Sequence, residues 1–581
     1  MNMINLTIDG IPVSVPEGST VLEAAKAANI NIPTLCYLKD VQQIGACRLC
    51  LVQIKGARSL AAACVMPAGE GMEVSTNTPE IRRGRKINLE LLLSNHNREC
   101  TSCVRSGNCE LSALCNEYGV DSYPYDGVKN DATVDDVSPS IVRDNSKCIH
   151  CRRCVATCNK IQKVGAIGAS RRGIKTTIGC AFERSLADSP CINCGQCITA
   201  CPTGALHEKS SINEVWDAIN DPTKHVVVQP APAVRAAIGE EFGMPMGVAT
   251  TGKLAAALRR LGFDRVFDTD FAADLTIMEE GTELISRLKD PNAALPMITS
   301  CSPGWIKYCE TFYPEFIPNL SSCKSPHQMM GAVVKSYYAE KKGIDPESIY
   351  VVSVMPCTAK KFEAGREELS NRGMQDVDAV LTVSELARMI KQAGIDYKRL
   401  PDEDFDPLLG ESTGAGVIFG ATGGVMEAAL RTVYEVVTGK TLENVDFHAV
   451  RGIEGVKEAE VDLDGKKVRV AVAHSTGNAK KLLDAIKNGE KQYEFIEVMG
   501  CPGGCVTGGG QPIVSAKELM YVNVKELRAK ALYDEDAGKA KRKSHENEEL
   551  KKLYEEYLGE PNGHKAHELL HTTYVPRKKY E

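Results

Sequence analysis

The chain repeats one cysteine pattern, first as CIHCRRCVATCN at 148–159 and again as CINCGQCITACP at 191–202. Both copies have the spacing C-x2-C-x2-C-x3-C, and in bacterial proteins with two such runs the fourth cysteine of each run binds the cluster of the other. We therefore predict two [4Fe–4S] clusters, one on Cys148, Cys151, Cys154 and Cys201 and one on Cys191, Cys194, Cys197 and Cys158. The first copy lacks the final proline, which weakens a local turn preference without removing a ligand.

Clustered cysteines in so long a chain favour metal binding over disulfides. There are 23 cysteines in 581 residues; disulfide scaffolds are short secreted domains, whereas this length predicts several domains. The net charge of −7 gives no basic signature for nucleic acid, and no apolar run approaches the roughly 20 residues that span a bilayer. No secretory or twin-arginine signal is visible, so we expect a cytoplasmic protein without nucleic-acid or membrane partners.

Upstream of the repeat, residues 1–78 have the pattern of a small α+β domain. Two short strands meet at an Asp9-Gly10 turn, and residues 20–28 have helical character after a Ser19 or Thr20 cap. Four thiolates in this domain suit a [2Fe–2S] cluster, although a structural zinc ion also accepts four sulfurs. The hairpin and helix favour the cluster, whose predicted ligands are Cys36, Cys47, Cys50 and Cys64.

A histidine and three cysteines form the next group, in a segment that we assign to 79–120. Residues 80–96 have the pattern of an amphipathic helix that leads into it. The ligand set suits zinc as well as a [4Fe–4S] cluster, and it comprises His96, Cys100, Cys103 and Cys109. Cys115 follows in a helical pattern and is expected to be a buried thiol, and the polar residues 121–140 are expected to be a linker.

These two groups resemble the large iron–sulfur subunit of respiratory complex I. The resemblance implies a [2Fe–2S] ferredoxin domain at 1–78 and a [4Fe–4S] cluster on the histidine and three cysteines. A two-cluster ferredoxin domain at 138–209 would follow, which makes one [2Fe–2S] and three [4Fe–4S] clusters in all. Such a series of clusters transfers electrons, but it does not identify the reaction that supplies or uses them.

The character of the sequence changes after about residue 210. Apolar strands at 225–229, 348–355 and 468–474 alternate with helical stretches, which predicts an α/β domain of the parallel-sheet type over 210–530. The charged, helical residues 531–581 are expected to form an arm rather than a core of their own. The predicted fold class is therefore multidomain, with α+β domains followed by an α/β domain.

Three segments of this half carry cysteines beside proline or glycine: TSCSPGW at 299–305, MPCTAKKFE at 355–363 and EVMGCPGGCVTGGGQP at 497–512. These neighbours let the backbone approach a large cofactor closely. The glycine-rich run lacks the Lys-Ser/Thr of a phosphate loop, and no GxGxxG follows a strand, so nucleotide binding by this chain is the weaker interpretation.

The three segments resemble the signature motifs of [FeFe]-hydrogenases, and the resemblance extends to 276–284, 412–431 and 541–547. It implies a hydrogenase catalytic domain with an H-cluster, a [4Fe–4S] cube joined through a cysteine to a diiron unit with CO, cyanide and azadithiolate ligands. The positions that match are the cube ligands Cys357, Cys501 and Cys505 (the last also the bridge), the cyanide contact Lys360, and Met355 and Met499 against the diiron unit. For the two methionines, the alternative is ordinary packing in the core.

The first motif departs from the family pattern, which has two adjacent cysteines, a proton relay followed by the fourth cube ligand. Here Cys301 is followed by Ser302. An ungapped alignment puts Ser302 at the ligand position, whereas the preference of iron for soft sulfur slightly favours Cys301. Either Cys301 ligates the cube after a shift of the loop, or Ser302 ligates it while Cys301 remains the relay. An altered sequence is a third explanation.

Protons must reach a buried site through groups that both accept and donate them. By resemblance, the route comprises Arg287, Glu283, Ser321, Glu280 and Cys301. The alternative for the acidic residues at 279, 280 and 283 is a solvated helix face. His327 stands where the family often has glutamine, so hydrogen bonding there is expected to differ. The cysteines without partner spacing, expected to be core thiols, are Cys180, Cys309 and Cys323.

Taken together, the resemblance implies the catalytic subunit of an NAD(P)-linked, electron-bifurcating [FeFe]-hydrogenase, which interconverts H2 with protons and electrons. Electrons would leave through ferredoxin or through flavin- and NAD(P)-binding and small iron–sulfur subunits of a hetero-oligomer. The alternatives are a catalytically silent hydrogenase-like electron-transfer protein, against which the second and third motifs argue, and a sensory hydrogenase, for which no regulatory domain is evident. A complex I or formate dehydrogenase subunit would need a molybdopterin-type or related domain after residue 209.

Overall fold

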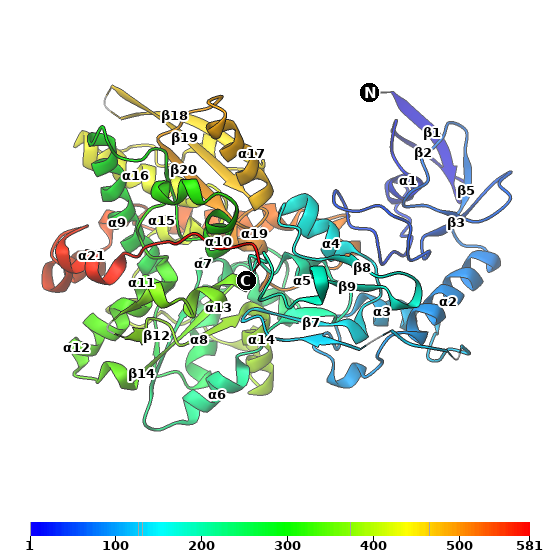
Figure 1. The fold of residues 1–581 in the computed structure, drawn as a ribbon, viewed down its shortest axis with the longest axis horizontal. Helices are drawn as coiled ribbons and strands as arrows, with labels where there is room; N and C mark the ends of the chain where they lie inside the picture. The colour runs from blue at the N-terminus through cyan, green and yellow to red at the C-terminus, as the bar shows by residue number, and fades with distance from the viewer. Residues whose placement is uncertain (1, 126, 131, 372, 464, 581) are drawn as a thin grey trace.

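The computed structural model describes residues 2–125, 127–130, 132–371, 373–463 and 465–580. The N-terminal cysteine-rich segments lie on one side of the molecule and the larger C-terminal part on the other (Figure 1). The linker expected at 121–140 includes positions 126 and 131, which lie outside the described residues. Its described residues form a single regular element, the short strand β6 (Val134–Asp135).

The N-terminal residues form a small sheet with one helix, as predicted. β1 (Met3–Ile8) and β2 (Ile11–Pro16) pair antiparallel on either side of the Asp9-Gly10 turn. α1 (Val21–Ala27) begins with a capping box between Thr20 and Glu23, in which each side chain satisfies a backbone N–H of the other residue. The sheet has the order β2-β1-β5-β3-β4 and is completed by β3 (Leu51–Ile54), β4 (Ala61–Ala62) and β5 (Glu73–Ser75).

A long helix, α2 (Pro79–Ser94), leads from this sheet to the next group of cysteines. It begins after the Thr78 cap with proline in its first turn, where a missing N–H is tolerated. Its buried Arg85 donates to the carbonyl oxygens of Leu51 and Thr76, and the helix packs against α3 (Glu110–Tyr118). These contacts fix the residues between α2 and α3 relative to the first sheet.

The repeated cysteine pattern forms two loops, each of which runs into a short helix. α4 (Arg153–Ala156) and α5 (Gln196–Ala200) lie against each other. β7 (Ile141–Asp144), which precedes the first loop, pairs antiparallel with β10 (Leu206–Glu208), which follows the second. A hairpin of β8 (Gly168–Ser170) and β9 (Thr177–Gly179) lies between the copies in sequence. The two runs of cysteines therefore face each other.

Two four-stranded sheets form the centre of the C-terminal part. The first has the order β12-β11-β14-β17 with every pair parallel, and consists of β11 (His225–Pro230), β12 (Arg265–Val266), β14 (Ile349–Met355) and β17 (Ala379–Thr382). The second has the order β13-β20-β19-β18, and consists of β13 (Met297–Ile298), β18 (Val456–Leu463), β19 (Lys466–His474) and β20 (Phe495–Met499).

The parallel pairing predicted for this part holds except at the edge strand β18. It pairs antiparallel with β19 because too few residues separate Leu463 from Lys466 for the crossover that a parallel pair requires. β13 ends directly before the first cysteine motif, and β14 and β20 end at Met355 and Met499, within the second and third motifs and before their cysteines. Both sheets therefore present motif loops at the carboxyl ends of their strands, where α/β proteins place their sites.

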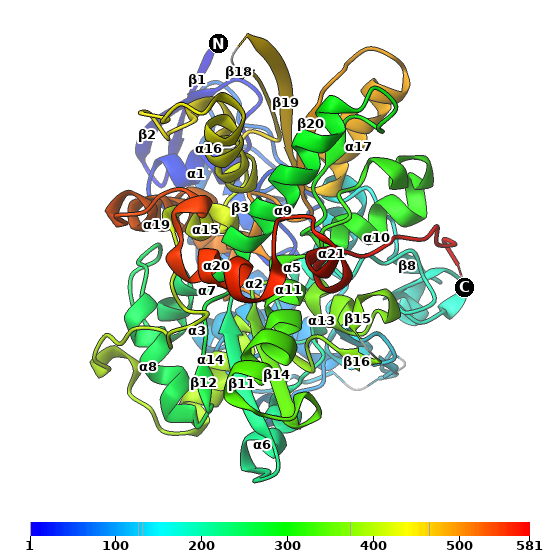
Figure 2. The same ribbon diagram turned by 90° about the vertical axis from the view of Figure 1, so that its left-hand side faces the viewer.

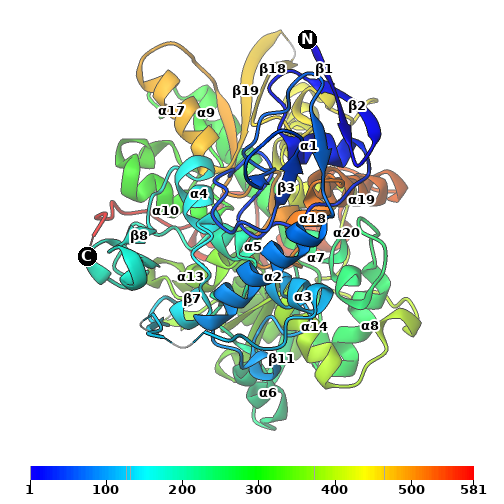
Figure 3. The same ribbon diagram turned by 90° about the vertical axis from the view of Figure 1, so that its right-hand side faces the viewer.

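Helices cover these sheets, and the C-terminal arm runs over them. One of them is α8 (Thr251–Leu261), and α9 (Thr269–Lys289) packs against α11 (Pro326–Val333) and α16 (Gly424–Thr438). The arm comprises the last part of α19 (Val524–Gly538), followed by α20 (Glu548–Leu553) and α21 (His564–Leu570). Its helices follow one another over the face shown in Figure 2, whereas the N-terminal domains occupy the opposite side, shown in Figure 3. The described helices include none that is long and apolar enough to span a membrane.

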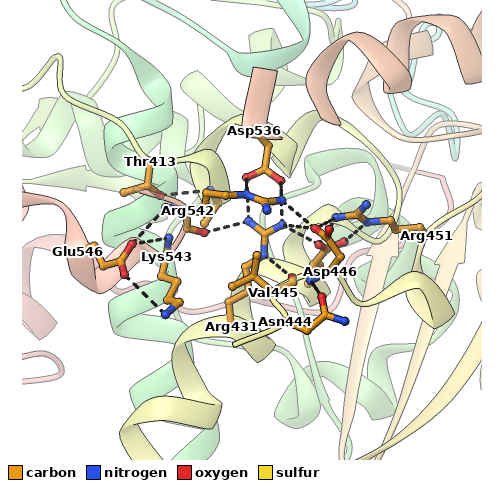
Figure 4. A network of polar contacts seen from close by, with 12 residues as sticks. Thr413, Arg431, Asn444, Val445, Asp446, Arg451, Asp536, Arg542, Lys543 and Glu546 are labelled. Carbon is orange, nitrogen blue, oxygen red and sulfur yellow. Dashed lines mark hydrogen bonds and ion pairs between the residues drawn. The ribbon is translucent and has the colours of Figure 1, made fainter. Parts of the chain in front are cut away.

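A network of buried ion pairs joins the arm to the domain beneath it (Figure 4). Arg431 on α16 lies 2.7 Å from Glu427 and 2.8 Å from Asp536 on α19, and all three side chains are fully buried. Arg542 pairs with Asp536 at 2.6 Å and with Asp446 at 2.7 Å. Buried charges are tolerated where each has a partner, so these contacts fix the arm in one position.

Candidate active site

The three motif loops surround one cavity of about 720 Å³ at the carboxyl ends of strands from both sheets. Its walls also include Pro232, His327 and Phe419. The motif residues that line it include Cys301, Ser302, Met355, Cys357, Lys360, Met499, Cys501 and Cys505. The fold therefore gathers into one cavity side chains from three separate parts of the sequence.

Close backbone contacts explain the glycines of the third motif. Gly503 and Gly504 have φ values of 87° and 98°, in the left-handed region that other residues rarely adopt. A Cβ on Gly504 would lie 2.7 Å from the nitrogen of Thr422, and one on Gly508 would lie 2.0 Å from the carbonyl oxygen of Pro356. These glycines allow the loop to bring its two cysteines to the cavity.

The donors in this cavity fit an iron–sulfur cube. Burial raises the pKa of the Cys501 and Cys505 thiols, that of Cys505 to about 12, and the neighbouring Cys357 adds to both shifts. Adjacent thiolates raise the free energy of a buried site from which water is excluded. A bound cationic metal compensates their charge and deprotonates its thiol ligands. Cys357, Cys501 and Cys505 are therefore suited to hold a cluster, with Met355 and Met499 on the walls of the remaining space.

Lys360 is held in the cavity wall by a chain of hydrogen bonds. Its Nζ donates to Glu363 Oε2 at 2.8 Å and to the Cys301 carbonyl oxygen at 3.1 Å. Burial raises the pKa of Glu363, but Lys360 and His327 outweigh it and lower the pKa to about 2. His327 Nδ1 lies 2.8 Å from Glu363, and its Nε2 lies 2.8 Å from the Ser353 hydroxyl. Both ring nitrogens of His327 therefore bond to protein groups.

Cys301 and Ser302 lie in different surroundings within the cavity. Burial raises the pKa of the Cys301 thiol, and the groups that act on it include Glu280, Lys360 and Cys505. Ser302 Oγ instead accepts the backbone N–H of Gly500 at 3.0 Å, directly before Cys501. Ser302 also precedes α10 (Pro303–Phe312) as its cap residue. The charge of Glu280 on α9 thus acts on the Cys301 thiol, and Ser302 is hydrogen-bonded to the loop of the third motif.

Glu279 and Glu280 on α9 are buried, so the solvated-face alternative is wrong for these two, whereas Glu283 is partly exposed. Glu279 is 0% exposed and Glu280 is 1% exposed. Burial is the main cause that raises the pKa of Glu280 to about 8, and the carboxylate of Glu283 is the second cause. Glu280 therefore carries a proton at neutral pH, which enables it to donate as well as accept.

The remaining residues of the predicted route lie between Glu280 and the surface. Ser321 Oγ donates to Glu283 Oε2 at 2.8 Å, and Arg287 Nη2 pairs with Glu283 Oε1 at 2.6 Å. The Ser321 hydroxyl also opposes the rise in the pKa of Glu280, although within the described residues neither oxygen of Glu280 has a hydrogen-bond partner. Hydrogen bonds and an ion pair thus join Ser321, Glu283 and the partly exposed Arg287. The links from Ser321 through Glu280 to Cys301 stay a prediction, and the whole predicted series from Arg287 to Cys301 is called the file below.

The sequence offered no signal for the contacts that the arm makes beside this file. His571 Nε2 lies 3.1 Å from Glu279 Oε2, and its Nδ1 lies 2.8 Å from the Ser322 hydroxyl. Cys323, expected to be a core thiol, is buried and lies 3.7 Å from Glu283 Oε2. Cys115, Cys180 and Cys309 are buried, as expected.

The two cysteine runs surround two further cavities. The first, of about 440 Å³, is lined by Cys148, Cys151, Cys154 and Cys201. The second, of about 380 Å³, is lined by Cys158, Cys191, Cys194 and Cys197. Each cavity thus combines three cysteines of one run with the fourth cysteine of the other.

Both N-terminal ligand sets lie next to the first of these cavities. Gln42, within the loop that carries the first cysteine set, donates to the carbonyl oxygens of Cys36 at 2.9 Å and Cys151 at 2.7 Å. Arg105, from the histidine and three-cysteine segment, donates to the carbonyl oxygen of Cys201 at 3.1 Å. The structure therefore places two separate branches beside one group of four cysteines. The cysteines of the first set, all buried, are Cys36, Cys47, Cys50 and Cys64.

His96 has the properties of a metal ligand. It is buried, and its Nδ1 has no hydrogen-bond partner in the part of the chain that the structure describes. Burial, and then Lys147, lower its pKa to about 4, which keeps the imidazole in the neutral form that binds metals. Cys103 and Cys109 are half-buried, and Cys100 is exposed.

The second cysteine run touches the loops of the active-site cavity. Gln196 Nε2 donates to the carbonyl oxygen of Thr507 at 2.9 Å, and the Thr358 hydroxyl donates to that of Asn193 at 2.7 Å. A Cβ on Gly509 would lie 2.4 Å from the Cα of Gly195. Only glycines permit so close an approach, which brings the second cysteine cavity against the motif loops.

Family models match consecutive segments of the chain. They are a 2Fe-2S iron-sulfur cluster binding domain at 1–79, the NADH-ubiquinone oxidoreductase-G iron-sulfur binding region at 85–123, the ferredoxin-like domain of NADH-quinone oxidoreductase subunit 3 at 138–207, the C-terminal domain of the iron only hydrogenase large subunit at 224–509, and the iron hydrogenase small subunit at 522–577.

Similar proteins span the chain. The NADP-reducing hydrogenase subunit HndD of Solidesulfovibrio fructosivorans is 51% identical over 100% of both chains. Iron hydrogenase 1 of Clostridium pasteurianum is 45% identical over 98% of this chain and 100% of its own. The solved structure of an [FeFe]-hydrogenase from Chlamydomonas reinhardtii is 46% identical and has a TM-score of 0.57, over 64% of this chain and 100% of its own.

Proposed function

The chain belongs to the iron-only, or [FeFe], hydrogenase family and catalyses the reversible interconversion of H2 with protons and electrons, and we propose a role for each residue of its site. The observation that carries these assignments is the single cavity that gathers Cys357, Cys501, Cys505 and Lys360 beside a file of buried carboxyl groups. A silent electron-transfer protein would need neither feature.

Cys357, Cys501 and Cys505 would hold the cube of the H-cluster, and Cys505 would bridge to the diiron unit. When bound, this group supplies the metal centre at which H2 is cleaved or formed. Lys360, oriented by Glu363, would contact a cyanide ligand, and Met355 and Met499 would pack against the diiron unit. The contacts support this arrangement because Lys360 is fixed at 2.8 Å from Glu363 in the cavity wall.

We propose Ser302 as the fourth cube ligand and Cys301 as the proton-relay thiol. The hydroxyl of Ser302 bonds to the Gly500 amide directly before Cys501, whereas Cys301 lies near Glu280. The preference of iron for sulfur opposes this assignment, and the position of the two side chains supports it.

Protons would pass between the cavity and solvent along the file, the predicted series of proton-transfer residues from Cys301 to Arg287. Cys301 exchanges a proton with Glu280, whose pKa of about 8 makes gain and loss of the proton similar in free energy near neutral pH. The rotating hydroxyl of Ser321 transfers the proton to Glu283 at 2.8 Å. Arg287 lies at the outer end, where its Nη2 pairs with Glu283 Oε1 at 2.6 Å.

We further propose one [2Fe–2S] and three [4Fe–4S] clusters, in domains at 1–78, 79–120 and 138–209, followed by the catalytic domain at 210–530 and the arm at 531–581. The two N-terminal branches would feed the cluster on Cys148, Cys151, Cys154 and Cys201. The cluster in the second cysteine cavity would exchange electrons with the active site, because its loop touches the motif loops.

Flavin- and NAD(P)-binding subunits, small iron–sulfur subunits and ferredoxin are the proposed partners, in a cytoplasmic hetero-oligomer. The support is the 51% identity to a protein named as a subunit of an NADP-reducing hydrogenase and the match of residues 85–123 and 138–207 to segments of NADH oxidoreductases. This chain has no GxGxxG after a strand with which to bind the nucleotide itself.

Replacing Ser302 with cysteine is expected to raise the reduction potential of the cube, by on the order of tens of millivolts, because a hard oxygen ligand stabilises oxidised iron more than sulfur does. The measurement is a redox titration followed by electron paramagnetic resonance, in protein that holds the cube but lacks the diiron unit. Cys301→Ala is the matched variant, and its cube is expected to assemble with an unchanged potential. Loss of the cube in Cys301→Ala, with no change in Ser302→Cys, would show that Cys301 is the ligand.

A further inference from the structure

Three potential metal ligands meet where the C-terminal arm crosses the outer end of the carboxylate file. Glu283 on α9, Cys323 before α11 and His571 after α21 each offer one ligand atom, and these atoms lie within 4.8 Å of one another. An isolated antiparallel bridge pairs Cys323 with His571, so the arm holds the histidine beside the thiol. The assigned roles in hydrogen conversion use neither Cys323 nor His571.

One oxygen of Glu283, Oε2, lies outside its ion pair, and it accepts the Ser321 hydroxyl at 2.8 Å and the Ser322 backbone N–H at 3.1 Å. Arg287 binds Oε1, at 2.6 Å from Nη2 and 3.0 Å from Nε. Oε2 faces the sulfur of Cys323 at 3.7 Å. Monodentate ligation through Oε2 would therefore leave the Arg287 pair in place. The Glu283 side chain is 12% exposed, so an ion can reach this end of the file from solvent.

His571 has the carboxylate support that metal-binding histidines usually have. Its Nε2 lies 3.1 Å from Glu279 Oε2, an oxygen that also accepts the N–H of Asn562 at 2.8 Å. A carboxylate only accepts, so Nε2 carries the proton and the lone pair lies on Nδ1. That lone pair now accepts the Ser322 hydroxyl at 2.8 Å. Histidine ligands typically donate their second nitrogen to such a carboxylate, which orients the ring.

We propose that Glu283, Cys323 and His571 form a binding site for Zn²⁺, and that zinc bound there stops proton transfer. Sulfur, imidazole nitrogen and carboxylate oxygen are the donors that zinc takes, with water in a fourth position. The thiolate and the carboxylate balance the charge of the ion, and the proton of Cys323 is released to solvent on binding.

Inhibition follows from the atom that the metal occupies, and this part of the proposal rests on the relay role proposed for Glu283. Oε2 of Glu283 is also the acceptor of the Ser321 hydroxyl at 2.8 Å. A metal on Oε2 displaces that hydrogen bond and interrupts the file between Ser321 and Glu283. Zinc would therefore slow both directions of hydrogen conversion without contact with the active-site cavity.

The experiment compares fully iron-loaded and matured enzyme with its Cys323→Ala, His571→Asn and Cys309→Ala variants. Cys309 is a buried thiol elsewhere in the fold and serves as the matched control. After exposure to ZnCl2 and gel filtration, zinc per chain is measured by mass spectrometry, and zinc X-ray absorption reports its ligands. Wild type and Cys309→Ala are expected to retain a single zinc ion with one sulfur ligand, and Zn²⁺ should inhibit their H2 evolution reversibly with EDTA.

Cys323→Ala and His571→Asn are expected to need at least about 10-fold more zinc for the same inhibition, because each loses a ligand. Equal zinc binding in Cys323→Ala and Cys309→Ala would overturn the site. Zinc retained with a sulfur ligand but without inhibition would overturn the block of the relay. A wild type that binds zinc yet converts no H2 even without zinc would instead contradict the proposed function, so the two failures are distinguishable.

Discussion

Replacing Cys301 with alanine is expected to lower H2 evolution and H2 oxidation by about 100- to 10,000-fold, the usual contribution of a positioned proton-transfer group. The thiol is the innermost member of the file and lies near Glu280. Alanine has no proton to exchange, so the cavity loses its connection to Ser321 and Glu283. The measurement is turnover in both directions, together with the infrared spectrum of the matured variant, which should retain its CO and cyanide bands.

Cys309→Ala is the matched control for this loss. Cys309 is fully buried, and its sulfur contacts the carbonyl oxygen of Tyr313 at 3.5 Å, away from the file. Its turnover should stay within a few-fold of wild type. Wild-type turnover in Cys301→Ala would contradict the relay, and loss of the CO and cyanide bands in that variant would indicate a ligand role for Cys301 instead.

Replacing Arg431 with methionine is expected to lower the free energy of unfolding by about 3–5 kcal/mol, the usual cost of removing one partner from a buried ion pair. Glu427 and Asp536 would remain buried with part of their charge uncompensated. Because Asp536 lies on α19, the contact between the arm and α16 is expected to loosen as well (Figure 4). The measurement is unfolding by urea or heat, followed by near-ultraviolet circular dichroism.

Arg259→Met provides the comparison for a surface pair. Arg259 lies 2.8 Å from Glu403 and is 32% exposed, so its loss should cost at most about 1 kcal/mol. If the two variants unfolded at the same denaturant concentration, the network around Arg431 would not be what fixes the arm.

The cysteine spacings predicted much of the N-terminal half because ligand spacing is a local property. Cys201 and Cys158 lie far from their partner runs in sequence, yet the crossed pattern of two-cluster proteins assigned each of them to a group, and each lines the cavity of that group. The Asp9-Gly10 hairpin and the Thr20 cap are likewise short-range features that a sequence displays directly.

No sequence pattern predicted the long-range contacts of the C-terminal half. His571 reaches Glu279 only because the arm crosses α9, and no spacing relates two residues so far apart. The buried pairs of Arg431 are invisible for the same reason, since arginine and aspartate are ordinarily surface residues. The antiparallel edge strand β18 follows from a short connection whose importance is clear only when the sheet is seen.

The choice between Cys301 and Ser302 illustrates the limit of ligand chemistry alone. Softness favours sulfur on iron, and the sequence supplies no competing argument beyond alignment. The hydrogen bond from the Gly500 amide to Ser302 and the effect of the Glu280 charge on Cys301 both arise from the tertiary structure. They support the opposite assignment, which the Ser302→Cys potential tests.

Infrared spectroscopy of the protein matured with the diiron cofactor tests the central assignment most directly. Hydrogen conversion in the cavity lined by Cys357, Cys501 and Cys505 predicts CO and cyanide bands that shift when H2 replaces an inert atmosphere. Absence of those bands from protein that holds its iron–sulfur clusters, or bands that do not respond to H2, would contradict it.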